Sequence, residues 1–360
     1  MLQQFLHKRR TAFFTTICIM FMLSICACSR QDRSENNHPW DDVLFENIRT
    51  PLELTEETQH GYLSTEHIAF INDNLIGRVS FSYCEKDAAV WLVEMLLAMG
   101  YTWDEIQIQE FVSEEIYANW ENYSDWISRQ GANPRYSSQN VILTVSGQSE
   151  RIIIVGAHYD TAISNPGASD NASGMALLLE SAQRMLYLDN YYTIVYIFFG
   201  AEERGISGSH HYVDGLSESE QSNILFMVNA DTLFEGTYLL YAVGYNEHHR
   251  PDANAIVSAW DDIASALYDK YAIGLMQHPD GIAYLWSDHR PFYYADIPVV
   301  MLLGRRRTSD GSFWLRANHT DQDCLHLINE EFPGKIDSAM WTYSLFLEDM
   351  LLHRYDVRAD

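Results

Sequence analysis

The chain has 360 residues, and 47% of them are hydrophobic, which is enough for one large core without requiring a second domain. Its 50 acidic residues outnumber its 23 Lys and Arg residues, so the formal charge is -27. A surface of this charge repels phosphate backbones and anionic lipid headgroups, and this argues against a nucleic-acid-binding protein.

The first 27 residues have the pattern of an export signal. Lys8, Arg9 and Arg10 form a basic segment, and residues 11–27 are apolar but too few to span a bilayer comfortably. The sequence Ile25-Cys26-Ala27-Cys28 looks like a bacterial lipobox. We therefore expect residues 1–27 to be a lipoprotein signal peptide and a lipidated Cys28 to anchor the protein on the extracytoplasmic side of a membrane. An ordinary signal peptide or an uncleaved anchor is the alternative interpretation.

Residues 28–60 are polar and predict a tether, and residues 61–360 predict one folded domain. Apolar residues at helical spacing predict helices over 87–99, 175–186, 205–213, 255–268 and 335–352. Short β-like runs predict strands over 141–145, 152–155, 192–199, 224–228 and 297–303. Strands that alternate with helices indicate an α/β fold, a single three-layer αβα domain around a mostly parallel, mixed central sheet.

Two cysteines, Cys84 and Cys324, fall within the predicted domain. An exported protein can form disulfides, but two buried thiols are an equally good explanation of this pair. The sequence leaves both interpretations open.

Three of the predicted strands run into residues that can bind metal. His158 follows the strand over 152–155, Glu202 and Glu203 follow the strand over 192–199, and Asp231 follows the strand over 224–228. Because ligands gather at the carboxyl ends of strands in open α/β sheets, we expect these side chains to share one site.

Two further residues complete the candidate set. Asp170 lies in a loop of Ser, Asn and Gly residues, and His319 lies far along the chain. Two His, two Asp and one Glu can hold two zinc ions, and the second Glu is then available to move protons. Asp160, two positions after His158, is expected to accept the other ring proton of that histidine.

Each residue also has an ordinary explanation when it is taken alone. His158 could be a packed histidine, Asp170 a helix N-cap, and Glu202 with Glu203 an exposed acidic turn. The remaining histidines near these segments are expected to be surface or structural residues: His210, His211, His248, His249, His278 and His289.

The order of these motifs resembles the co-catalytic zinc aminopeptidases of peptidase family 28, which include aminopeptidase Y and bacterial leucyl aminopeptidases. The resemblance covers roughly residues 75–350. The matching blocks are Gly156-Ala157-His158-Tyr159-Asp160, Ala168-Ser169-Asp170-Asn171-Ala172-Ser173-Gly174, Gly200-Ala201-Glu202-Glu203, Asn229-Ala230-Asp231, Ser287-Asp288-His289-Arg290-Pro291-Phe292 and Asn318-His319-Thr320.

The resemblance implies a zinc-exopeptidase-like fold and specific roles. Asp170 would bridge two zinc ions, His158 and Asp231 would complete one ion, and Glu203 and His319 the other. Glu202 would be the general base, Asp160 would support His158, and peptides would be the substrates. Thr232 departs from the Met that is frequent in the family after the fourth ligand-bearing segment.

Two other functions share this fold. A single-zinc glutaminyl-peptide cyclotransferase is one, and a non-catalytic surface lipoprotein that only binds peptides is the other. The intact loop around Asp170 and the pair Glu202-Glu203 favour the peptidase. Residues 233–286 match no motif, so the preferred terminal residue, aminopeptidase against carboxypeptidase action, and the oligomeric state stay open.

Overall fold

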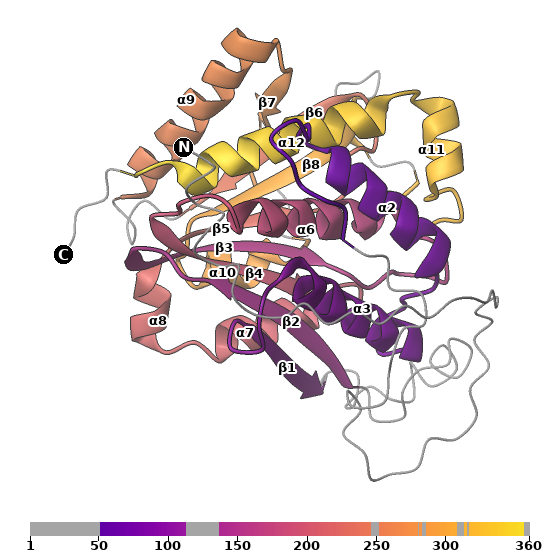
Figure 1. Ribbon diagram of the computed structural model, residues 1–360, viewed down its shortest axis with the longest axis horizontal. Coiled ribbons are helices and arrows are strands. Elements are labelled where there is room, and N and C mark those ends of the chain that lie inside the picture. The colour runs from indigo at the N-terminus through magenta and orange to yellow at the C-terminus, as the bar shows by residue number, and fades with distance from the viewer. Residues whose placement is uncertain are drawn as a thin grey trace. The chain divides into compact units, whose positions relative to one another are not determined.

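A mixed β-sheet forms the centre of the part of the chain that the structure describes (Figure 1). The computed structural model describes residues 51–112, 137–245, 252–279, 281–282, 286–307, 313–314 and 317–355, which all belong to the compact unit Asn36–Asp360. Within them, eight strands follow the order β1-β2-β4-β3-β5-β8-β6-β7, and β9 pairs with β8. The strands are β1 Ile106–Val112, β2 Ser137–Val145, β3 Ser149–His158, β4 Tyr192–Phe199, β5 Ile224–Ala230, β6 Tyr238–Gly244, β7 Leu275–Gln277, β8 Val299–Arg307 and β9 Phe313–Trp314.

The four central strands β4, β3, β5 and β8 are parallel to one another. Antiparallel pairs flank them, β1 with β2, β2 with β4, and β6 with β8. This arrangement confirms the predicted α/β fold with a mixed sheet. Because the central strands are parallel, their carboxyl ends all lie at the same edge of the sheet. The motif residues that come directly after these strands in the sequence therefore lie at that edge.

Helices cover both faces of the sheet. One core contains Ile153, Val155 and Ala157 of β3 together with residues of α2 Tyr62–Asn74, α3 Tyr83–Met99, α6 Ser173–Met185, α9 Ala253–Tyr271 and α12 Lys335–Leu352. Ile154, which points the other way, packs in a second core with residues of α7 Ser207–Asp214 and α10 His289–Tyr294. The short helices α8 Glu218–Asn223 and α11 Leu325–Glu331 complete the set. The central strands are apolar on both faces because each face is covered.

Several element boundaries differ from the predicted ones for local reasons. Helix α3 begins at Tyr83, four residues earlier than expected, because Ser82 caps it by accepting a hydrogen bond from the Glu85 amide. Strand β8 begins after Pro298, which has no amide proton to give to a ladder. Helix α12 has the predicted bounds. Helix α2 and strands β1, β6 and β7 were not predicted.

Residues 51–60 of the predicted tether contact the domain. The Leu52 carbonyl accepts a hydrogen bond from Gln183 of α6 (2.6 Å), and His60 lies 3.1 Å from Glu348 of α12. The predicted signal peptide, Cys28 and the earlier part of the tether lie outside the described residues.

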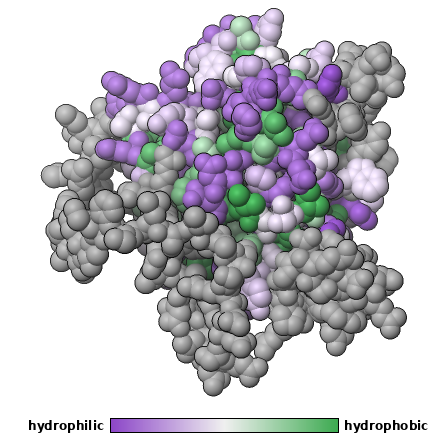
Figure 2. All heavy atoms as spheres, turned by 90° about the vertical axis from the view of Figure 1, so that its right-hand side faces the viewer, coloured by the Kyte–Doolittle hydropathy of each residue, from purple (hydrophilic) through white to green (hydrophobic). Residues whose placement is uncertain are grey.

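No helix in the described ranges is long and apolar enough to cross a membrane. On the face shown in Figure 2, hydrophilic side chains predominate among the described residues, and hydrophobic side chains appear between them in small patches. Cys84 and Cys324 are both half-buried and form no disulfide.

Candidate metal centre

The carboxyl ends of three parallel strands bring the predicted residues together. His158 is the last residue of β3, Asp231 directly follows β5, and Glu202 and Glu203 follow β4 after two residues. In the sheet, His158 pairs with Phe199 at the end of β4, and Gly156 pairs with Asn229 near the end of β5. This register places the carboxyl ends of β3, β4 and β5 side by side at the same edge of the sheet.

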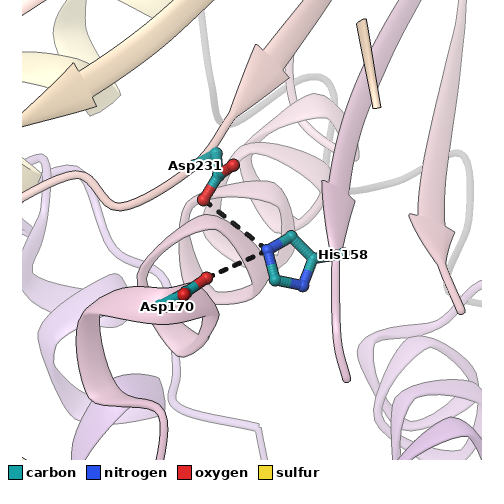
Figure 3. A group of neighbouring side chains, drawn as sticks. All are labelled: His158, Asp170 and Asp231. Atoms are coloured by element: carbon teal, nitrogen blue, oxygen red, sulfur yellow. Dashed lines mark ion pairs between the residues drawn. The ribbon is translucent and has the colours of Figure 1, made fainter. Parts of the chain in front are cut away.

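His158, Asp170 and Asp231 form one cluster, which we call the His158 triad (Figure 3). His158 Nε2 lies 3.1 Å from Asp170 Oδ1 and 3.6 Å from Asp231 Oδ1. All three side chains are almost completely buried, so the triad is enclosed by protein.

Asp170, Glu203 and His319 form a second cluster, the His319 triad. His319 Nε2 lies 3.3 Å from Asp170 Oδ2 and 2.9 Å from Glu203 Oε2. The side chain of His319 is 54% exposed, whereas that of Glu203 is only 6% exposed. This triad therefore faces solvent through its histidine.

Asp170 belongs to both triads, one carboxylate oxygen in each. It does not cap the following helix, because Asn171 Oδ1 accepts the Gly174 amide hydrogen bond (2.9 Å) instead. The amides of Ser169 and Asp170 donate to Asp323, at 2.7 and 3.0 Å. The Asp170 carboxylate therefore faces both imidazoles, His158 with one oxygen and His319 with the other.

Asp160 connects the ends of β3 and β4. Its Oδ1 lies 3.4 Å from His158 Nδ1, and its backbone carbonyl lies 3.2 Å from the same nitrogen. Its carboxylate also accepts hydrogen bonds from the amides of Glu202 (3.0 Å) and Glu203 (3.1 Å) and from the hydroxyl of Ser80 (2.5 Å). With its proton on Nδ1, where these two acceptors lie, a neutral His158 would direct the Nε2 lone pair at a cation in the triad.

Burial and charge repulsion perturb the acids of the site. Burial raises the pKa of Glu202 well above its usual value, and repulsion by Glu203 raises it further. Burial and the charge of Asp170 raise the pKa of Glu203 to about 7. Hydrogen bonds to Asp170 and Glu203 raise the pKa of His319 to about 10. The site therefore holds excess negative charge that protons or cations must balance.

The donor set fits metal ions. The ligand atoms of each triad lie within 4.8 Å of one another. Glu203 Oε1 and Asp231 Oδ1 are buried, yet neither has a hydrogen-bond partner among the described residues. Buried carboxylate oxygens without partners are costly unless a cation takes them, and imidazole nitrogen with carboxylate oxygen is a donor set that zinc accepts.

Four buried charged residues that contact or adjoin the site were not identified as functional from the sequence. Arg78 donates to the carbonyls of Leu75, Tyr159, Pro166 and Gly167 and so ties the His158 loop to the segment before α3. Burial raises the pKa of both Asp288 and Asp323 to about 7. Repulsion by Asp160 and Asp231 adds to the pKa of Asp288, and repulsion by Asp170 adds to that of Asp323. The fourth is Glu85 of α3. Asp288 lies in the matching block Ser287–Phe292, whereas no local pattern indicates a role at the site for Arg78, Glu85 or Asp323.

The histidines expected to be surface or structural residues occupy varied places. His289 is buried, and its Nδ1 lies 3.3 Å from Asn229 Nδ2, which also donates to Ser287 Oγ at 2.8 Å. The segment Ser287–Phe292 and the segment Asn229–Asp231 are therefore in direct contact. His211 is exposed and His278 is buried, whereas His248 and His249 lie outside the described residues.

A model of peptidase family M28 matches residues 140–344, which include all the candidate site residues. The chain belongs to peptidase family M28. This M28 chain is 32% identical over 202 residues to Aminopeptidase YwaD of Bacillus subtilis, a match that covers 54% of the chain and 41% of YwaD. It is 36% identical over 100 residues to "Probable lipoprotein aminopeptidase LpqL" of Mycobacterium tuberculosis, covering 27% of the chain and 20% of that protein. The matches thus span less than half the length of these curated relatives.

Two solved structures share the fold of this M28 chain. BSAP, a zinc aminopeptidase from Bacillus subtilis, superimposes with a TM-score of 0.61 at 18% identity and covers 82% of this chain and 96% of BSAP. A glutaminyl cyclase from Fimbriiglobus ruber superimposes with a TM-score of 0.59 at 16% identity. The match covers 83% of this chain and 97% of the cyclase. At such identities the likeness shows the fold, and the choice between the two activities depends on the site.

Proposed function

We propose that the chain is a two-zinc exopeptidase, and specifically an aminopeptidase that hydrolyses the N-terminal residue from peptides. The observation that carries the proposal is the position of Asp170, whose two oxygens lie 3.1 Å from His158 Nε2 and 3.3 Å from His319 Nε2. A carboxylate with one oxygen in each of two triads is suited to bridge two cations. The names of YwaD and BSAP support the aminopeptidase activity.

The roles of the ligand residues follow from their surroundings. His158 and Asp231 would hold one zinc ion with Asp170, and Glu203 and His319 would hold the other. When bound, the ions would lower the pKa of water and polarise the carbonyl of the scissile peptide bond. Asp160 keeps the proton of His158 on Nδ1, so that Nε2 can donate its lone pair.

Glu202 is the proposed general base. It is buried beside both triads but is not part of either. Because burial and Glu203 raise its pKa, the Glu202 carboxylate holds a proton more tightly than an exposed glutamate does. Glu202 would take a proton from the attacking water and pass it to the leaving amine, so that one residue acts first as base and then as acid.

Purified protein supplied with zinc tests the proposal on aminoacyl and N-terminal glutaminyl substrates. Release of the N-terminal residue by the wild-type protein supports it, and absence of any reaction contradicts it. Glu202→Gln should keep both zinc ions and lower kcat by about 10²–10⁴-fold. Near-normal turnover of this variant with bound metal would remove Glu202 from the role of base.

A glutaminyl cyclase is the second candidate, since one such enzyme has this fold. The two complete triads favour the peptidase, because a single-zinc enzyme needs only one of them. Zinc stoichiometry separates the two functions. Two ions per chain with release of an amino acid support the peptidase, whereas one ion with ring closure of an N-terminal glutamine supports the cyclase.

We also propose that residues 1–27 direct export, that a lipid on Cys28 anchors the protein outside the cytoplasm, and that residues 28–60 link this anchor to the domain over 61–360. The pattern Ile25-Cys26-Ala27-Cys28 and the name of the relative LpqL support this location. Cys28→Ser should move the protein from the membrane fraction and abolish labelling with a radioactive fatty acid. Unchanged fractionation would contradict the anchor.

A further inference from the structure

The turn after β4 carries both Glu202 and Glu203, and its backbone is tightly constrained. Ala201 has a positive φ of 52°. A Cβ at Gly200 would collide with Ser138 Oγ and the Gln139 carbonyl. The turn closes through the Ser207 amide, which donates to the Ala201 carbonyl at 3.1 Å. The positions of the two glutamates therefore depend on what holds this backbone.

Three successive amides of the turn donate to buried carboxylates. The Ala201 amide donates to Glu85 Oε1 at 2.8 Å, and those of Glu202 and Glu203 donate to the two oxygens of Asp160, at 3.0 and 3.1 Å. Two carboxylates from different segments thus hold three consecutive residues.

Glu85 is itself fixed in place. Its Oε2 accepts from the Phe81 amide at 2.6 Å, and its Oε1 also accepts from the Ser138 hydroxyl at 2.8 Å. The side chain is almost completely buried. Glu85 therefore joins the start of α3, strand β2 and the turn after β4, which lie far apart in the sequence.

The ordinary role of a glutamate at this position would be a capping box. Ser82 and Glu85 have the required spacing, and in that motif the Glu side chain accepts the amide of the capping serine. In this structure the Ser82 amide donates to the Val79 carbonyl instead. The Glu85 carboxylate is thus available to the turn, although Asp160, another acid, lies close enough to repel it. Helix capping alone does not account for this arrangement.

We propose that Glu85 is a positioning residue, whose carboxylate fixes the backbone at Ala201 and so places Glu202 and Glu203 against the two triads. Glu85 belongs to neither triad, and its hydrogen bond to this turn is the one from the Ala201 amide. The inference rests on the proposed function for the roles of Glu202 and Glu203, but the contact itself can be tested without any activity.

Glu85→Ala is compared with Glu180→Ala as a matched control. Glu180 of α6 is also buried and accepts the amides of Gly61 and Ser64, both at 2.8 Å, but it does not touch the turn. Both variants are expected to unfold at lower temperature than the wild type. Only Glu85→Ala should speed amide hydrogen exchange across residues 200–206 and lower kcat by about 10²-fold at saturating zinc, with KM nearly unchanged, because a displaced base costs mainly the chemical step.

The outcomes separate this inference from the proposed function. Unchanged exchange over residues 200–206 in folded Glu85→Ala, or an equal change in Glu180→Ala, overturns the role of Glu85 whatever the enzyme does. If the wild-type protein has no peptidase activity, the proposed function is wrong. The hydrogen-exchange result still tests whether Glu85 holds the turn after β4. If Glu85→Ala does not fold, Glu85→Leu replaces it. Its side chain fills much of the same space but has no oxygen to accept from the Ala201 amide, so wild-type exchange over residues 200–206 and wild-type kcat in this variant would equally overturn the proposal.

Discussion

The His158 triad and the His319 triad share Asp170 but differ in their access to solvent. His158 is the last residue of a central strand, and its side chain is 2% exposed. His319 lies in a turn after β9 with a positive φ of 58°, and its side chain is 54% exposed. One triad is thus part of the core, and the other is completed by a loop at the surface.

This difference indicates a division of tasks between the triads. A metal ion in the buried triad would be held by three almost completely buried side chains, with little freedom to exchange. A metal ion in the open triad would meet solvent and substrate first, because the His319 side chain is 54% exposed. The same contrast predicts that equivalent substitutions in the two triads have unequal effects.

Removal of the shared residue should have the largest effect. Asp170→Ala deletes a ligand from both triads, so we expect loss of both zinc ions and a fall in kcat/KM of roughly 10⁴-fold or more. Metal analysis by mass spectrometry and peptide hydrolysis measure the two effects. Full zinc occupancy in the folded variant would refute the bridging role of Asp170.

Removal of each histidine in turn should separate the two triads. His158→Ala leaves the carboxylates of Asp170 and Asp231 buried without their imidazole, which should destabilise the metal-free fold by ~3–5 kcal/mol. His319→Ala should cost much less, because its side chain is half exposed. Urea unfolding of the two metal-free variants measures this difference.

Chemical rescue provides the control for this pair. Added imidazole can enter the space left by His319, which opens to solvent, but not the space left by His158. We therefore expect partial recovery of activity in His319→Ala alone. Equal rescue of both variants would show that the triads do not differ in access.

The smallest expected effect is the pH dependence of the metal-free protein. Hydrogen bonds to Asp170 and Glu203 raise the pKa of His319 from its usual 6.5 to about 10. The folded state therefore binds this proton more tightly, so the stabilisation is complete below about pH 6.5 and is lost as the pH rises through about 10. Because the imidazole is half exposed, the effect should be modest and should weaken in salt.

The difference in free energy of unfolding between the wild-type protein and His319→Gln, both metal-free, isolates this contribution. It should be largest near pH 6 and vanish by roughly pH 10.5. A difference that does not change over this range would contradict the ion pairs of His319. With zinc bound, Nε2 of His319 would hold the metal in place of this proton, so the stabilising effect of low pH should be lost.

The sequence predicted the central elements of the fold because their signals are local. Strands β3, β4 and β5 are apolar runs that are buried on both faces, and helix α6 shows the spacing of a buried helix. Some candidate residues follow such strands closely in the sequence. Their closeness in space could therefore be predicted from the rule that the carboxyl ends of parallel strands lie at one edge of the sheet. Their roles as zinc ligands and general base remain predictions that the variants above test.

The unpredicted parts depend on contacts between distant segments. Strand β6 is an apolar run like β5, but no candidate ligand follows it, and it pairs with β8 and β7 only in the folded sheet. The role of Arg78 is visible only once the carbonyls of Tyr159 and Gly167 surround its guanidinium. Likewise, nothing near Glu85 in the sequence indicates that its carboxylate meets the Ala201 amide, 116 residues further on.

The segment before residue 140 lies outside the matched family region, yet Arg78, Ser80 and Glu85 all belong to it. A fragment that begins at residue 140 would keep every candidate ligand but lose the groups that hold the loops bearing His158 and Glu202. Exchange of catalytic segments between relatives of this family would meet the same obstacle. Helices α2 and α3 and the segment between them would have to be transferred together with the candidate ligands, because Arg78, Ser80 and Glu85 hold the loops on which those ligands lie.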